Sequence, residues 1–163
     1  MDNIHISLNE FRNASRVIKE TSSLLRRGIF EKITIIALGA NDLPEHELID
    51  ENIHVLRIRL KTRNLSKHPL VQLIKYLEFS IKCINSIRKL KPRVVNIHGL
   101  ALLVLASYSK YINKHLLVYD AHELETEVNG LKGLRKSIAK WIERGFIRYC
   151  DLILVVSESI ADL

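Results

Sequence analysis

The stretch RVVNIHGLALLVLASYSKYINKHLLVYD, residues 93–120, decides the fold. Its first six residues (93–98) and its last six (115–120) are largely apolar, which is typical of strands buried on both sides. Between them, residues 100–112 are apolar and long enough for a packed helix. A strand, a helix and a second strand in this order predict two parallel strands joined by a covering helix.

The same alternation extends over the rest of the chain. Further strands are predicted at residues 4–8, 32–38, 52–60 and 151–157, and further helices from about residues 14, 69 and 132. This order predicts an α/β fold of the Rossmann-like, doubly wound type. We expect a parallel sheet of about six strands with helices on both faces, in three layers α/β/α. The apolar strands agree with this, because a strand covered on both sides has no polar face.

Two segments carry more specific predictions. Residues 42–51 contain five acids and no Lys or Arg, and are predicted to form an acidic loop. The longest helix should begin at Pro69 and end before Pro92. Helical spacing predicts that its apolar face consists of Leu70, Leu73, Ile74, Leu77, Ile81, Ile84 and Ile87.

Length and composition fit a single globular domain. The chain has 163 residues, of which 47% are apolar. No apolar run approaches the ~20 residues of a membrane-spanning helix, and the first residues, MDNIHIS, lack the pattern of a signal peptide. Cys83 and Cys150 lie far apart in apolar surroundings, so we predict reduced core thiols, as in a cytoplasmic protein.

The net charge of +7 is unevenly distributed. Residues 57–93 contain eleven Lys or Arg and one acid, so this segment carries +10 and the remainder −3. Such a region suggests an anionic partner, namely a membrane surface, nucleic acid or a phosphorylated substrate, although a solvated basic face has the same signature. The side chains predicted to face a membrane are Arg59, Lys61, Arg63 and Lys67 in one loop, and Lys136, Lys140, Arg144 and Arg148 along one helix.

Titratable residues gather where predicted strands end. In an open α/β sheet, ligands bind beyond the carboxyl ends of the strands. The segments at four such ends are NEFRNASR, RLKTRNLSKH, HG and DAHELETE. Asp120 and His122 are therefore predicted to reach a ligand crevice, with loop capping as the alternative. His98 is either a crevice residue or a satisfied loop histidine, and Glu125 and Glu127 can simply complement a helix dipole.

Several familiar sites are absent from the sequence. The first loop has no glycine, so it lacks the G-x-G-x-x-G pattern of dinucleotide-binding proteins. There is no Walker A or G-x-S-x-G motif, and HELET places Thr126 where H-E-x-x-H requires histidine. We therefore expect no bound cofactor and no metal site, because the spacing of His98, His122 and Glu123 does not favour one.

Three longer stretches form one pattern. They are NASRVIKETSSLLRRGIFEKITIIAL (13–38), VVNIHGLALLVLASYSK (94–110), and LLVYDAHELETE (116–127) with GFIRYCDLILVVSESIADL (145–163). Together they resemble the N-terminal domain of a glycosyltransferase family 4 enzyme with the GT-B fold. The D-x-H-E stretch with its downstream D…VSE is the most specific part. The first loop departs from many members of the family, because Phe11, Arg12 and Asn13 stand where those members have glycines.

The resemblance implies roles for individual residues. His122 matches the family histidine that approaches the donor sugar, and Asp120 would position its loop, so these two are the predicted catalytic residues. Glycosyl transfer builds positive charge on the sugar ring and negative charge on the leaving diphosphate, which acids, a histidine and nearby basic groups would stabilise. The predicted substrate-binding residues are Glu123, His98, Arg12, Arg16 and Asn13.

The resemblance also implies a domain organisation. Residues 1–163 would form the acceptor-binding domain, and the C-terminal domain that binds the nucleotide-sugar donor is missing from this sequence, so the isolated domain is predicted to be inactive. The expected acceptor is lipid-linked or a polysaccharide, such as a capsule. The expected location is the cytoplasm, peripheral on the inner membrane face.

Two alternatives remain open. The first is a non-catalytic, membrane-anchoring subunit of a split glycosyltransferase. The second is a basic nucleic-acid-binding domain. The few aromatic residues and the lack of a basic–aromatic motif argue against nucleic acid, which we do not expect as a partner.

Overall fold

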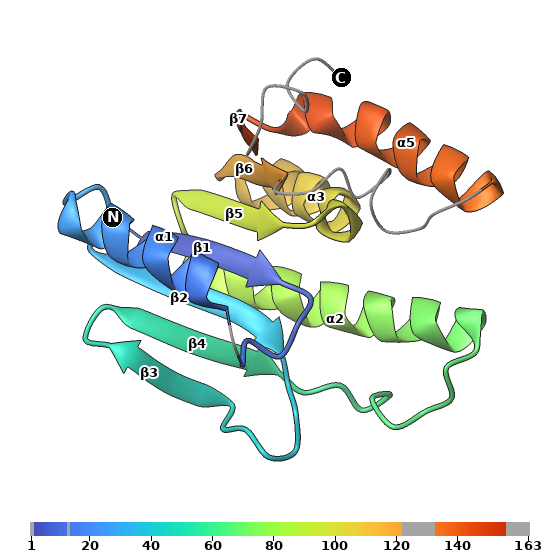
Figure 1. Cartoon of the computed structure of the whole chain (residues 1–163), viewed down its shortest axis with the longest axis horizontal. Coiled ribbons are helices and arrows are strands. Elements are labelled where there is room, and N and C mark those ends of the chain that lie inside the picture. The colour runs from blue at the N-terminus through green and yellow to red at the C-terminus, as the bar shows by residue number, and fades with distance from the viewer. Residues whose placement is uncertain (1, 13, 122–132, 156–163) are drawn as a thin grey trace.

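The structure, a computed structural model, describes residues 2–12, 14–121 and 133–155, with residues 134–136 described by their backbone alone. Its strands form one sheet in the order β3-β4-β2-β1-β5-β6-β7 (Figure 1). The strands are β1 (Asp2–Ser7), β2 (Lys32–Leu38), β3 (His46–Asp50), β4 (Ile53–Ile58), β5 (Val94–His98), β6 (Leu116–Ala121) and β7 (Leu152–Val155). The helices are α1 (Ser15–Arg26), α2 (Pro69–Leu90), α3 (Leu103–Asn113) and α5 (Leu134–Phe146), with 3-10 turns η1 (Leu100–Leu102) and η2 (Ile147–Tyr149).

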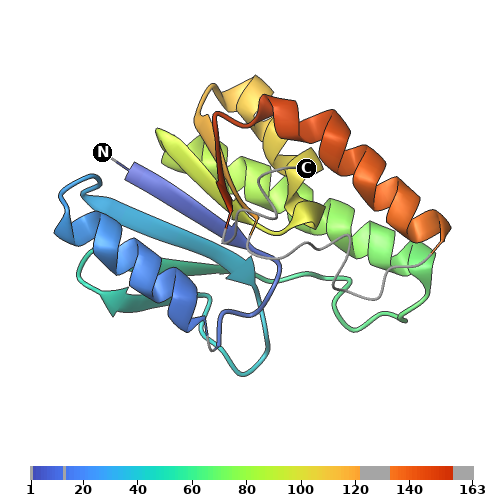
Figure 2. The ribbon, with the colours of Figure 1, turned by 45° about the horizontal axis from the view of Figure 1, so that its top comes forward.

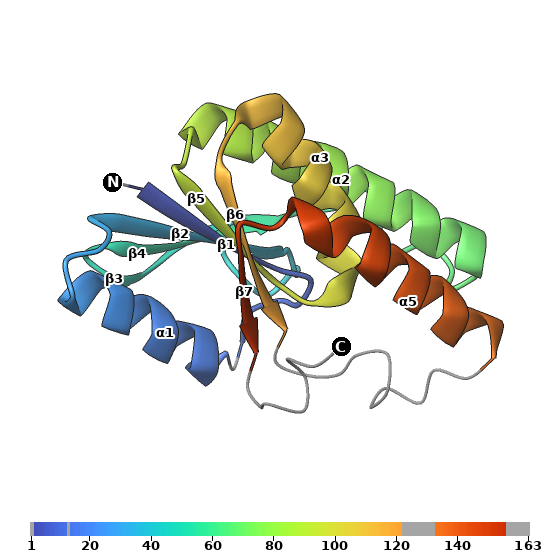
Figure 3. The ribbon, with the colours of Figure 1, turned by 90° about the horizontal axis from the view of Figure 1, so that it is seen from above.

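Helices cover both faces of the sheet. Seen from above, α1 lies on one face and α2, α3 and α5 lie on the other (Figure 3). All neighbouring strands that the structure describes are parallel, except for the antiparallel pair of β3 and β4. The predicted Rossmann-like α/β fold is therefore confirmed, with seven strands in place of about six.

The strand order places a switch point at the centre of the sheet. From β1 the chain proceeds outward through β2 and β4, then returns to the other side of β1 and continues through β5, β6 and β7. In open α/β sheets the carboxyl ends of the strands beside such a reversal border the ligand crevice. The ends of β1 and β5 therefore mark where a ligand is expected.

Each face of the sheet has its own apolar core. Successive side chains of a strand point to opposite faces. Ile4 and Ile6 of β1 pack with α2 and α3, in a core that includes Phe79. Ile33 and Ile35 of β2 pack on the opposite face, in the core beneath α1.

Most predicted ends of helices and strands are correct to within about two residues, because local signals fix them. Gly28 adopts a left-handed φ of 66° just after α1, which other residues rarely adopt. Pro69 occupies the first turn of α2, as predicted. Cys83 is buried and Cys150 half-buried, and both are free thiols. Burial raises the pKa of Cys83 to about 12 and that of Cys150 to about 11.

The prediction of a loop at residues 42–51 is wrong in part, because this segment contains the edge strand β3. Acidic residues are uncommon in strands, but charged side chains are tolerated at the edge of a sheet. Glu47 of β3 forms an ion pair of 2.6 Å with the buried Arg57 of β4. Arg57 also donates hydrogen bonds to the carbonyls of Glu10 and Pro44, at 3.1 and 3.2 Å. It is thus a buried structural side chain and not part of a basic surface.

Only part of the predicted apolar face of α2 lies in the core, where Ile87 is buried and Ile84 packs against the buried residues. The buried residues of this helix are Phe79, Ser80, Cys83 and Ile87. Most of the predicted face is instead 50–66% exposed, namely Leu70, Leu73, Ile74, Leu77 and Ile81. Spacing identifies an apolar face, but the packing of α2 on β4 and α3 decides which face is covered. Within the described ranges, no helix combines the length and apolarity needed to cross a bilayer.

Candidate functional site

Polar side chains cross the centre of the sheet beneath α1. They belong to β1, β5 and β6, and each is at most 8% exposed: Asn3, His5, Ser7, Asn96, His98 and Asp120. The prediction that the strands have no polar face is therefore wrong for these strands. Burying polar groups is costly unless they form hydrogen bonds. A row of this kind at the switch point indicates a functional arrangement.

Four of the side chains in this region form one connected chain. A guanidinium nitrogen of Arg16, in the first turn of α1, donates to Asp120 Oδ1 at 2.9 Å. Asp120 Oδ2 lies 2.9 Å from His98 Nδ1. His98 Nε2 lies 2.9 Å from His5 Nδ1, and the two rings stack with centroids 5.2 Å apart. We call Arg16, Asp120, His98 and His5 the buried relay.

The chemistry of the groups fixes the direction of the hydrogen bond between His98 and Asp120. A carboxylate next to a guanidinium can only accept, so His98 donates from Nδ1 to Asp120. His98 Nε2 and His5 Nδ1 share the next hydrogen bond of the chain. Burial, and then repulsion from His98, hold the pKa of His5 well below its usual value, so His5 is neutral at pH 7. The relay thus ends at Arg16, whose side chain is 49% exposed and can present its remaining donors to an anion.

Glu20 brings a carboxylate close to the relay. One ligand atom each from His5, Glu20 and His98 lies within 4.8 Å of the others, and this is the group that could hold a metal ion among the described residues. In the structure both ring nitrogens of His98 are already engaged, one with Asp120 and the other with His5. Our expectation of no metal site stays a prediction.

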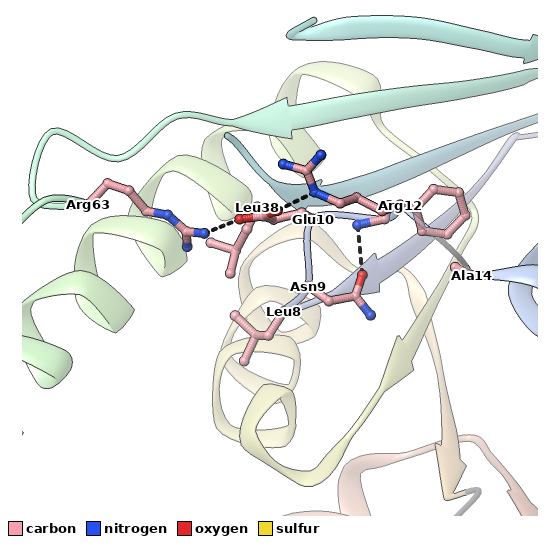
Figure 4. A pocket seen from close by; sticks show the side chains of 8 residues that line it. Leu8, Asn9, Glu10, Arg12, Ala14, Leu38 and Arg63 are labelled. Atoms are coloured by element: carbon pink, nitrogen blue, oxygen red, sulfur yellow. Dashed lines mark hydrogen bonds and ion pairs between the residues drawn. The ribbon is translucent and has the colours of Figure 1, made fainter. Parts of the chain in front are cut away.

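A pocket of about 510 Å³ lies beside the carboxyl ends of β1 and β2 (Figure 4). It is lined by the first loop together with Leu38 and Arg63. Glu10 pairs with both Arg12 and Arg63 at this pocket. The guanidinium of Arg12 also forms two bonds of 2.6 Å with the carboxylate of Asp42. The two carboxylates raise the pKa of Arg12 and already balance its charge, so a phosphate would have to compete with them for this side chain.

The structure places the remaining predicted site residues as follows. Asn13, His122 and Glu123 lie outside the described residues. Asp120 and His98 adjoin at the ends of β6 and β5, where they are paired in the sheet register.

The predicted membrane-facing residues lie on two separate elements. Arg59, Lys61 and Lys67 are exposed on the segment between β4 and α2, and Arg63 is half-buried there. In the second group, Arg144 is exposed on α5 and Lys140 is half-buried, whereas the side chain of Lys136 lies outside the described residues. Arg148 follows on η2, with its guanidinium 5.0 Å from the ring centroid of Tyr149.

Sequence reasoning missed His5, Glu20, Asn3 and Asn96 as members of this region. Asn3 donates to the side chain of Asn96 at 2.8 Å, in the same row as the relay. The available signal was the alternation of polar and apolar residues in NIHIS and VVNIH, within strands expected to be buried on both sides. Glu20 had no signal, because acids on helices are usually solvated.

Comparison with known proteins decides the family. The sequence profile described as Glycosyltransferase Family 4 matches residues 14–163. The chain belongs to glycosyltransferase family 4. Among curated protein sequences, no significant match was found.

Solved structures with a similar fold include GT-B glycosyltransferases. Sucrose-phosphate synthase from Thermosynechococcus elongatus superposes on 99% of this family 4 domain with a TM-score of 0.72 and 11% identity, over 44% of its own chain. MurG from Acinetobacter baumannii superposes on 94% with a TM-score of 0.56 and 11% identity, over 40% of its own chain. HepE from Anabaena, in complex with UDP-glucose, superposes on 94% with a TM-score of 0.54 and 12% identity, over 36% of its own chain.

These likenesses show the fold of the family 4 domain. The chain spans less than half the length of each of these three enzyme chains. The predicted membership of the family and the predicted GT-B architecture are confirmed.

Proposed function

We propose that this family 4 domain is the acceptor-binding half of a nucleotide-sugar-dependent glycosyltransferase. The observation that carries the proposal is the convergence of Arg16, Asp120 and His98 at the carboxyl ends of β5 and β6. This is the edge at which open α/β sheets bind ligands. Asp120 also lies two residues before His122 and three before Glu123; the family resemblance assigns His122 to the donor sugar and Glu123 to the acceptor or the sugar.

The buried relay would act by positioning. Asp120 is held by Arg16 on one side and by His98 on the other, which fixes the end of β6. His122 would then approach the donor sugar, Asp120 would position its loop, and Glu123 would contact the acceptor or the sugar. Arg16, with donors to spare, would face a phosphate of the donor or the acceptor. Preorganised groups of this kind stabilise the charge that develops in glycosyl transfer.

The remaining parts of the proposal concern partners and location. A second domain would bind the nucleotide-sugar, as HepE binds UDP-glucose. The acceptor would be a lipid-linked sugar or a polysaccharide of the cell surface, and the protein would work in the cytoplasm, peripheral on the inner membrane face. The exposed basic residues between β4 and α2 support an anionic surface as partner. Whether the natural chain continues beyond Leu163 separates this proposal from the membrane-anchoring subunit of a split enzyme.

The experiment is a transfer assay with radiolabelled nucleotide-sugars and lipid-linked acceptors. We expect no turnover with the 163-residue chain alone, and turnover with the chain joined to its donor-binding domain. In the two-domain protein, His122→Ala should lower turnover at least ~10-fold, since a hydrogen bond made mainly in the transition state is worth over ~1.4 kcal/mol. Turnover by the short chain, or unchanged turnover by a natively folded His122→Ala variant, would contradict the proposal.

A further inference from the structure

The exposed apolar side of α2 has no role in the fold or in the proposed site. It consists of Leu70, Leu73, Ile74, Leu77 and Ile81, which we call the apolar stripe. Their positions follow the pattern i, i+3, i+4, i+7 and i+11, which places them on one side of the helix. Each is at least half exposed. Monomeric proteins rarely leave contiguous apolar surfaces of this kind uncovered, so the stripe indicates a partner.

The position of α2 explains why the stripe is uncovered by the described chain. The amino-terminal half of the helix extends beyond the carboxyl ends of the central strands (Figures 1 and 2). Phe79, Cys83 and Ile87 anchor the other half in the core. The helix is therefore held rigidly at one end and presents its apolar stripe at the other.

A basic pocket adjoins the stripe at the same end of α2. It has a volume of about 540 Å³ and is lined by Arg63, Lys67, Gln72 and Lys75. The Lys75 ammonium donates to the carbonyl of Leu65 at 2.8 Å, which leaves further donors. Lys67 is exposed. A phosphate would find positive charge within one turn of the apolar stripe.

Apolar and basic residues side by side favour one kind of partner over the others. A second copy of the chain would bring two molecules of net charge +7 together, and its own basic pocket would repel this one. An anionic bilayer offers both requirements at once, with hydrocarbon for the stripe and phosphates for the pocket.

We propose that the amino-terminal half of α2 docks on an anionic lipid bilayer, with the apolar stripe in the acyl boundary and the basic pocket on a lipid phosphate. The docking itself is argued without the proposed function, and only its benefit to the enzyme rests on that function. Docking through α2 would bring the carboxyl edge of the sheet, where Asp120 lies, to the membrane surface that carries a lipid-linked acceptor. It also revises the predicted mode of membrane binding, because the apolar stripe would contact the bilayer together with the basic loop between β4 and α2.

The test is co-sedimentation of the 163-residue chain with vesicles of phosphatidylcholine and phosphatidylglycerol. We expect binding that Leu73→Glu/Leu77→Glu weakens at least ~10-fold in partition coefficient, which is a loss of ~1.4 kcal/mol. The matched control, Ile29→Glu/Leu48→Glu, makes the same charge change at residues outside α2 that are 46% and 64% exposed, and should weaken binding less than ~2-fold. Circular dichroism checks that both variants are folded.

A second pair of variants tests the pocket. Lys67→Gln/Lys75→Gln should weaken binding to the anionic vesicles more than Lys19→Gln/Arg26→Gln, which removes the same charge from α1. If the stripe variant or the pocket variant lost no more vesicle binding than its own control, only net charge would matter, and the proposal would be overturned. Absence of binding by the unmodified chain would overturn it too, as would self-association in sedimentation equilibrium that the stripe variant abolishes. The assay involves no sugar transfer, so its failure is distinct from failure of the proposed function.

Discussion

Replacing Asp120 by alanine removes the central acceptor of the buried relay. The carboxylate accepts one hydrogen bond from Arg16 and one from His98, each of 2.9 Å. The side chains of Asp120 and His98 are 2% and 3% exposed, whereas Arg16 is half exposed. The two bonds should therefore contribute unequally to stability.

The magnitude follows from this difference in exposure. Leaving the buried Nδ1–H of His98 without its acceptor costs about 1–3 kcal/mol. Arg16 can return to water, so its loss adds only about 0–1 kcal/mol. We expect Asp120→Ala to lower the free energy of unfolding by about 2.5 kcal/mol, which shifts a urea midpoint by roughly 1 M at an m-value near 2 kcal/mol/M.

Urea unfolding followed by circular dichroism measures this change. Arg16→Ala is the control and should cost less than about 1 kcal/mol. A double-mutant cycle between Asp120→Ala and His98→Ala should give a coupling of about 1–2 kcal/mol, because the two side chains share one buried bond. A cost for Asp120→Ala equal to that of Arg16→Ala, or no coupling with His98, would refute the reasoning.

Three further predictions concern the buried relay, the sheet and the core. The pKa of His5 lies below its unfolded value of 6.5, so its contribution to stability is present above pH 6.5 and is lost as the pH falls below that value. The free energy of unfolding of His5→Asn should therefore vary less between pH 7 and pH 5.5 than that of the unmodified chain. An equal pH dependence of the two proteins would exclude His5 as the source of this loss of stability. Gly39→Ala would place a Cβ 2.9 Å from the Cα of Arg59 and should cost about 1–3 kcal/mol in a urea titration, whereas Gly145→Ala on α5, with open space around its Cβ, should be neutral or stabilising. Burial raises the pKa of Cys83 to about 12, so a thiol reagent at pH 8 should label this residue only after urea is added, and rapid labelling of the native protein would contradict its burial.

Much of the candidate site could be predicted from the sequence. Arg16, His98 and Asp120 were identified from their positions at predicted strand ends, and the structure brings all three together. Their connection through His5 could not be predicted. His5 lies 93 residues from His98, and only the pairing of β1 with β5 brings the two rings into contact.

The sequence by itself determined the order of strands and helices apart from β3, because local alternation, turn residues and prolines specify most elements within a few residues of the chain. It also determined the family, since each motif that carries the resemblance is a continuous stretch of the sequence. Only the tertiary structure decided which surfaces are covered. Leu73 and Leu77 share the spacing of a core face. They stay exposed because α2 is oriented with Phe79 and Cys83 towards the sheet, and because its amino-terminal half extends beyond the sheet. In the same way, His5 and Asn3 were not recognised as members of the site, because their partners His98 and Asn96 lie 93 residues away in the sequence. Burial depends on neighbours that are remote in sequence, and a local pattern carries no information about them.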